Sequence, residues 1–116
     1  MKFTALVIMI EDKKEEEVIK VAKDAGAGSV TILHGKSIGL NEKKVFFGLT
    51  LEENVSLLLF LLPARVSLRV MRIINKEFDL PNMDNSGVSF IIPLSHVVGL
   101  DMEEVHKFED DIRHLL

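Results

Sequence analysis

The chain has no cysteine, tyrosine or tryptophan, so phenylalanine is its only aromatic residue type. Without cysteine there is no disulfide, no thiolate ligand for a metal and no cysteine nucleophile. Without tyrosine, regulation by modification of a tyrosine side chain is excluded. A net charge of −4 and a shortage of rings for base stacking also argue against a nucleic-acid-binding protein, which normally presents a basic surface.

Long apolar runs are missing as well. The longest, Leu57–Leu62, is far below the roughly 20 residues that a membrane-spanning helix needs. The apolar segment Met1–Ile10 is followed by charged residues rather than by a signal-peptide cleavage site. We therefore expect one soluble, cytoplasmic domain over residues 1–116, not embedded in a membrane and large enough to fold around its own core.

The chain alternates between strand and helix signals. A first helix is predicted from Asp12, read as the N-cap of a capping box with Glu15, to about Ala25. A second helix follows Pro63 and ends near Phe78. Four runs rich in β-branched and other apolar residues predict strands: Phe3–Ile10, Ser29–Leu33, Val55–Leu62 and Val88–Leu94.

The order β-α-β-β-α-β predicts an α+β, ferredoxin-like sandwich, and the amphipathic residues 101–116 add a C-terminal helix. A strand with one face in water alternates apolar and polar residues, but strands one, three and four are apolar on both faces. A mean hydropathy of +0.25 is also high for a small monomer. We therefore expect an obligate homo-oligomer in which sister subunits cover the second face of the sheet.

One segment stands out as a candidate binding site. Gly35 and Gly39 flank Lys36 and Ser37, directly after the predicted buried strand Ser29–Leu33. A polar loop bracketed by glycines can bring backbone N–H groups close to an anion. The segment contains neither the full P-loop motif nor G-x-G-x-x-G, so ordinary turns remain an alternative interpretation.

The other candidate site residues are weaker, and none of them forms a recognisable catalytic arrangement. The three glutamates Glu15–Glu17 suit the solvated first turn of a helix. His34 and His96 have no local Asp or Ser partner of the kind that a nucleophile system needs. Two further sets have regular helical spacing. The second predicted helix carries a basic stripe that could bind an anion or an acidic partner: Arg65, Arg69, Arg72 and Lys76. The predicted C-terminal helix carries three residues at a spacing that can hold a metal ion: His106, Asp110 and His114.

Residues 3–98 resemble the P-II nitrogen-regulatory signal proteins and their P-II-like relatives. The resemblance depends on four short motifs: Gly28-Ser29-Val30-Thr31, Lys36-Ser37-Ile38-Gly39, Leu61-Leu62-Pro63 and Ser89-Phe90-Ile91-Ile92-Pro93. It implies a homotrimer with the sheets facing inward, nucleotide sites in the clefts between subunits and a protruding loop that docks onto target proteins.

The sequence departs from the family pattern at several phosphate-contacting positions. Val55 stands where the family has a lysine, and Asn85-Ser86-Gly87-Val88 replaces its Gly-Asp-Gly-Lys loop. Gly99 and Asp101 stand at its two late arginines. Most of the charge-assisted donors that a triphosphate needs are therefore missing.

The resemblance implies a trimeric signalling protein that senses a small anionic effector, such as an adenine nucleotide, and regulates a transporter or an enzyme. Lys36 would neutralise the anion, and the effector would order the loop over residues 40–54. Two alternatives remain: a trimeric, ferredoxin-like cation-tolerance protein that binds metal through His34, His96 or the tail, and a trimer that only docks. The implied cleft residues are Thr31, Gly35, Lys36, Ser37, Gly39, Asn85, Ser86 and Gly87.

Overall fold

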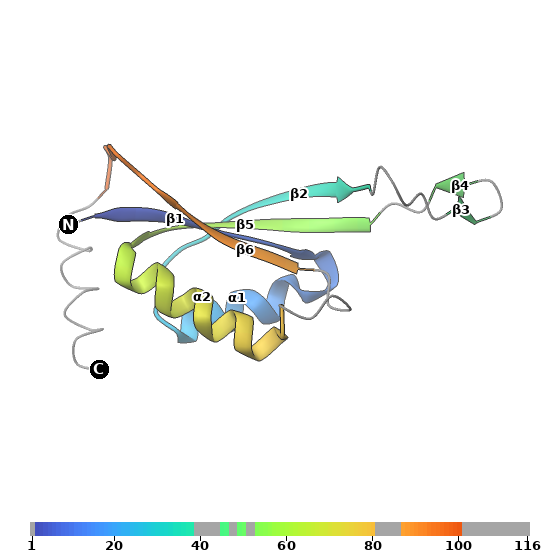
Figure 1. Cartoon of the computed structure of the whole chain (residues 1–116), viewed down its shortest axis with the longest axis horizontal. Helices are drawn as coiled ribbons and strands as arrows, with labels where there is room; N and C mark the ends of the chain where they lie inside the picture. Colours follow the sequence, from blue (N-terminus) through green and yellow to red (C-terminus); the bar gives the residue numbers. More distant parts are fainter. Residues whose placement is uncertain (1, 39–44, 47–48, 51–52, 81–86, 101–116) are drawn as a thin grey trace.

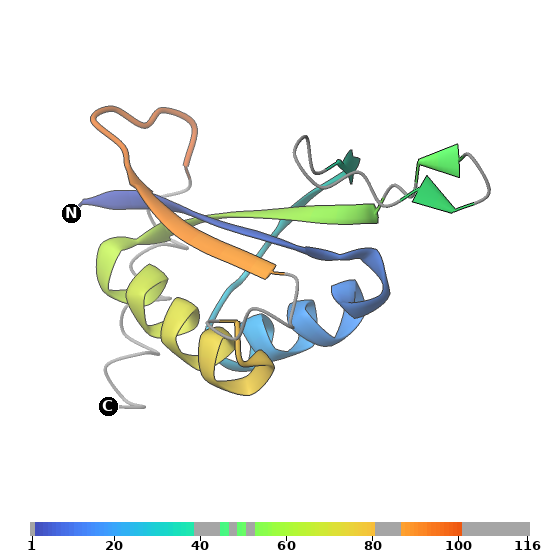
Figure 2. The same cartoon turned by 45° about the vertical axis from the view of Figure 1, so that its right-hand side comes forward.

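The structure is a computed structural model, and it describes residues 2–38, 45–46, 49–50, 53–80 and 87–100. A four-stranded antiparallel sheet has the order β2-β5-β1-β6, and helices α1 and α2 lie on one side of it (Figures 1 and 2). The elements of this sandwich are β1 (Phe3–Glu11), α1 (Glu15–Asp24), β2 (Thr31–Ser37), β5 (Glu53–Pro63), α2 (Ala64–Phe78) and β6 (Gly87–Pro93). The predicted α+β, ferredoxin-like order is therefore confirmed.

The core lies between the helices and the helix-facing side of the sheet. Because side chains alternate along a strand, every second residue of the central strands β1 and β5 points at the helices. Phe60 is the largest of these side chains and is 1% exposed. The other core residues come from both layers: Leu6, Ile8, Ile10, Leu58 and Leu62 from the sheet, and Val18, Ala22, Val66, Val70 and Ile74 from the helices.

The start of the first helix differs from the prediction. Residues Asp12–Lys14 form a short 3₁₀ helix, and α1 begins at Glu15 with Lys14 at the N-cap and no side-chain cap. The predicted capping box between Asp12 and Glu15 is therefore wrong. The physical reason is that the Glu15 carboxylate is already used in tertiary hydrogen bonds to Ser56 and His34.

The second strand also differs from its predicted position. It runs from Thr31 to Ser37 instead of ending at Leu33, since its pairing with β5 continues to Ser37 opposite Glu53. Gly35, Lys36 and Ser37 are thus part of a strand and not of a loop. The strand is exposed along its whole length, because it forms an edge of the sheet. The prediction that it is buried is wrong for the single chain.

Other boundaries agree with the sequence. Helix α2 ends at Phe78, as predicted, and Asp79 caps it in the left-handed region with φ of 48°. Strand β6 forms the second edge of the sheet, which is where Pro93 was expected. Between β2 and β5, strands β3 (Val45–Phe46) and β4 (Leu49–Thr50) pair in a small separate hairpin, drawn in green beyond the end of the main sheet in Figure 1.

The face of the sheet that points away from the helices, here called the open face, is apolar. Alternate residues of all four strands lie on it, and no described element covers it (Figure 2). This confirms the expectation of a second apolar face. Its most exposed large side chains are Leu33 (55%), Val88 (54%), Leu61 (45%), Ile92 (44%) and Phe90 (39%).

The predicted C-terminal helix, with His106, Asp110 and His114, lies outside the described residues. Within the described part of the chain, no helix is both long and apolar enough to cross a membrane.

Candidate functional site

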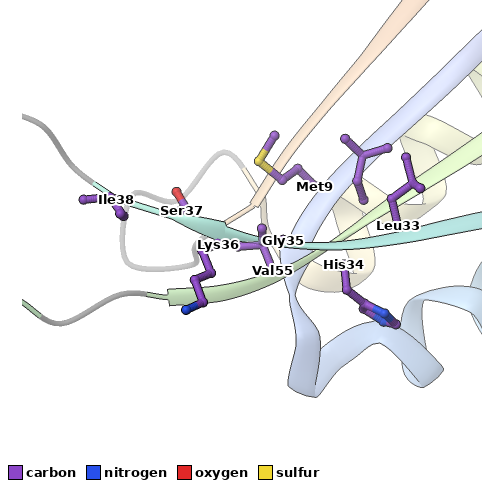
Figure 3. A pocket seen from close by; sticks show the side chains of 9 residues that line it. Met9, Leu33, His34, Gly35, Lys36, Ser37, Ile38 and Val55 are labelled. Atoms are coloured by element: carbon purple, nitrogen blue, oxygen red, sulfur yellow. The ribbon is translucent and has the colours of Figure 1, made fainter.

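A pocket of about 440 Å³ lies at the end of β2, next to the point where β2 and β5 lead into residues 39–52 (Figure 3). It is open to solvent and is formed largely by β2 itself. The residues that line it are Met9, Leu33, His34, Gly35, Lys36, Ser37, Ile38, Val55 and Leu57.

The two faces of β2 give the pocket two different walls. Leu33, Gly35 and Ser37 lie on the open face, whereas His34 and Lys36 point to the helix side (Figure 3). Within the described sheet, β2 pairs only with β5, so the backbone groups along its outer edge face solvent. A ligand along this edge can therefore meet backbone N–H groups, an apolar wall on one side and a cation on the other.

A hydrogen-bonded cluster joins the helix-side wall of the pocket to α1. The Ser56 hydroxyl donates to Oε1 of Glu15 at 2.7 Å, and Nε2 of His34 lies 2.6 Å from the same oxygen. Because an ionised carboxylate can only accept, His34 is the donor of the second bond. The hydrogen bond from Ser56, followed by the hydrogen bond and charge of His34, lowers the pKa of the Glu15 carboxyl below its ordinary value of 4.5.

This cluster is a structural tie and not a nucleophile system. In such a system the serine hydroxyl bonds the histidine, whereas here both groups bond Glu15. Ser56 is also fully buried, so its hydroxyl cannot reach a substrate. The cluster fixes the edge strand β2 to the first turn of α1, directly beside the pocket.

Sequence reasoning missed this cluster because its members come from three separate elements. His34 and Ser56 lie 19 and 41 residues from Glu15 along the chain. One signal was available: Ser56 is the only polar residue in the apolar run Val55–Leu62. A polar side chain in the middle of a buried strand needs a hydrogen-bond partner, which predicts a contact of this kind.

The predicted cleft residues are only partly brought together. Gly35, Lys36 and Ser37 line the pocket. Thr31 lies five positions before Lys36 on the same extended strand, about 17 Å away. Gly39, Asn85 and Ser86 lie outside the described residues.

Gly87 begins β6 at the opposite edge of the sheet. The register aligns it across Ile10 and Ser56 with His34, a span of three strand spacings or about 14 Å. Within one chain Gly87 therefore does not face the pocket. A cleft that joins the two segments would require a second subunit, and its residues stay predictions.

The histidines of the alternative metal hypothesis do not meet. His34 lies on edge strand β2, whereas His96 follows the other edge strand, near the opposite end of the sheet, and contacts Ser95 at 3.2 Å. Among the residues that the structure describes, no three His, Cys, Asp or Glu side chains are grouped so that they could hold a metal ion.

Neither a protein-family model nor a curated protein matches this sequence. Solved structures do. CPII, a nitrogen regulatory PII-like protein from Thiomonas intermedia K12 solved with ADP, AMP and bicarbonate, is 15% identical, with a TM-score of 0.63 over 86% of this chain and 98% of CPII. A putative PII-like signaling protein from Thermus thermophilus is 18% identical, with a TM-score of 0.60 over 81% of this chain and 88% of that protein.

The chain has the PII-like fold. This confirms, at the level of the fold, the resemblance found in the sequence. The same comparison also matches a Bacillus cereus protein related to NIF3, with a TM-score of 0.62 and 16% identity, but the match covers only 26% of that longer chain. The PII-like fold therefore also occurs as one part of a larger protein. The fold alone does not identify a ligand or a partner, and only the residues of this chain can indicate them.

Proposed function

We propose that the protein is a cytoplasmic, P-II-like regulatory homotrimer that senses a small anionic effector between its subunits. The observation that carries the proposal is the apolar open face, from which Leu33, Leu61 and Phe90 project while remaining between 39% and 55% exposed. Monomeric proteins rarely leave an apolar patch of this kind in water. Three sheets that face one another would bury it and would create clefts between neighbouring subunits.

The gain from such burial is substantial. Complete burial of a Val, Leu, Ile or Phe side chain is worth about 1.5–3 kcal/mol, and the five most exposed side chains of the open face are already half-buried. Removing the remaining half from water would stabilise the assembly by about 5 kcal/mol per subunit, before the cost of association. This gain favours assembly of the sheets over isolated chains.

The effector is proposed to bind along the outer edge of β2, around the pocket. Lys36 would meet its anionic group, and Ser37 and the outward backbone groups would supply further polar contacts. A Cβ atom at Gly35 would have no neighbour within 4 Å in the chain, so the glycine leaves space for a ligand or a second subunit. The CPII structure with ADP, AMP and bicarbonate supports an adenine nucleotide or bicarbonate as the effector.

Binding at this place is suited to regulation. The pocket ends at Ser37 and Ile38, where the chain enters the segment that contains the β3–β4 hairpin. A ligand that prefers one arrangement of the 40–54 loop would shift the loop towards it and would change its affinity for a partner such as a transporter or an enzyme. The proposed role is therefore control of another protein and not catalysis.

Isothermal titration calorimetry with ATP, ADP, AMP and bicarbonate tests the proposal. We expect at least one of them to bind, and we expect Lys36→Gln to weaken that binding by about tenfold, the loss of one charge-assisted contact. Lys20→Gln, an exposed lysine on α1 away from the pocket, is the matched control. Absence of heat with all four ligands, or equal weakening by both variants, would contradict the proposed effector site.

A further inference from the structure

The net charge of the chain is concentrated in its last residues. Residues 101–116 contain six acidic and two basic residues, so this segment carries a net charge of −4, equal to that of the whole chain. Residues 1–100 are therefore neutral overall. We call residues 101–116 the acidic tail; the acidic residues are Asp101, Glu103, Glu104, Glu109, Asp110 and Asp111.

The outer side of α2 has the opposite charge. Arg65, Arg69, Arg72 and Lys76 recur along one line of the helix, here called the basic stripe, while the other side of α2 packs into the core. None of the four forms an ion pair with a residue that the structure describes. The adjacent Leu68 is 42% exposed.

Arg69 adds a second observation. Its Nε atom is shielded from water and has no hydrogen-bond partner in the described structure. A buried donor without an acceptor is costly, and native proteins normally satisfy such a group. An acceptor is therefore expected beside the middle of the basic stripe, and a carboxylate suits a guanidinium best.

The chain leaves the sheet close to the start of α2. The backbone N–H of Leu94 donates to the carbonyl of Phe3 at 3.3 Å, and that of Ala64, the first residue of α2, donates to the carbonyl of Lys2 at 3.0 Å. Six residues then separate Leu94 from the acidic tail, a tether of at most about 20 Å. As the helix that its sequence predicts, the tail would be about 24 Å long, close to the 22 Å of the 15-residue α2.

We propose that the acidic tail of the chain docks along its own α2. Its carboxylates would pair with the basic stripe, and apolar residues of the predicted helix, such as Val105 and Phe108, would cover Leu68. Exposed ion pairs are individually weak, but the short tether raises the effective concentration of the tail. The contact forms within one chain, so it does not require the proposed trimer or effector.

Limited proteolysis of the full chain by chymotrypsin, with mass spectrometry of the fragment released after Phe108, tests this contact. We expect the charge reversal Arg65→Glu, Arg69→Glu, Arg72→Glu to speed this cleavage several-fold, because the tail would be repelled. The matched control reverses exposed lysines on the other helix, Lys20→Glu and Lys23→Glu, and should leave the rate unchanged.

A compensating variant separates docking from general destabilisation. Adding Glu103→Lys, Glu104→Lys and Asp111→Lys to the reversed α2 should restore protection, and none of these changes creates a chymotrypsin site. In the unaltered protein, raising the salt concentration should also speed cleavage, because screening weakens exposed ion pairs. Cleavage at one rate in all variants and salts would overturn the proposal, as would an equal effect of the α1 control.

Discussion

Replacing Leu61 by alanine is expected to weaken the trimer by about two orders of magnitude while each chain stays folded. Leu61 lies on the open face and is 45% exposed in the single chain. Burial of the exposed half of a leucine is worth about 1 kcal/mol, so three subunits lose about 3 kcal/mol together. Because 1.4 kcal/mol corresponds to tenfold, the association constant of the trimer should fall by about 100-fold. The midpoint concentration of a monomer–trimer equilibrium varies as the square root of this constant, so assembly should move to concentrations about tenfold higher.

The matched control is Leu68→Ala. Leu68 is 42% exposed but lies on α2, away from the sheet, so its loss removes a similar amount of apolar surface without touching the open face. Sedimentation velocity over a dilution series measures both variants against the parent protein. Equal dissociation of the two variants, or no change for Leu61→Ala at any concentration, would refute the assignment of the open face as the subunit interface.

Further predictions concern the pocket and its supports. Because the pKa of Glu15 is lowered in the fold, its ionised form stabilises the protein above about pH 4.5. This contribution is lost as the pH falls through the lowered pKa. In that range the melting temperature of the parent protein should therefore depend more steeply on pH than the melting temperature of Glu15→Gln. Gly35→Ala should leave the fold of each chain unchanged, because its Cβ meets nothing within the chain, but should impair effector binding in calorimetry. Gly87→Ala should change the free energy of unfolding in urea by no more than about 1 kcal/mol, since its Cβ would come too close, at 2.5 Å, only to a terminal methyl of Leu80, and that side chain can turn aside; a loss of about 3 kcal/mol would contradict this packing.

Much of the fold was readable from the sequence because both helices have clear periodicity. Val66, Val70 and Ile74 repeat along one side of α2, and the structure buries all three. The sequence located the strands but did not show which of their side chains face the helices. In the run Val55–Leu62 nearly every residue is apolar, so nothing in the sequence indicates that Phe60 faces the helices while Leu61 faces away. Only the pairing with β1 decides that.

The errors have one common cause, which is that local signals compete with tertiary contacts. Glu15 looked like a capping residue, but hydrogen bonds from Ser56 and His34 occupy its carboxylate. Gly35 looked like the start of a loop, but it continues the ladder with β5. The candidate site was found in part, since Gly35, Lys36 and Ser37 line the pocket.

The residues around Gly87 could not be connected to the pocket from the sequence or from one chain. They belong to the opposite edge of the sheet, and only a neighbouring subunit could place them against β2. The proposed effector site is therefore complete only if the subunits assemble. A ligand screen on a protein that stays monomeric would test an incomplete cleft.

The proposed homotrimer is tested most directly by the mass of the unaltered protein in solution, measured by light scattering from high concentration down to the micromolar range. We expect a particle with three times the 13.0 kDa mass of one chain throughout this range. A folded particle with the mass of a single chain, with the open face still in water, would contradict it.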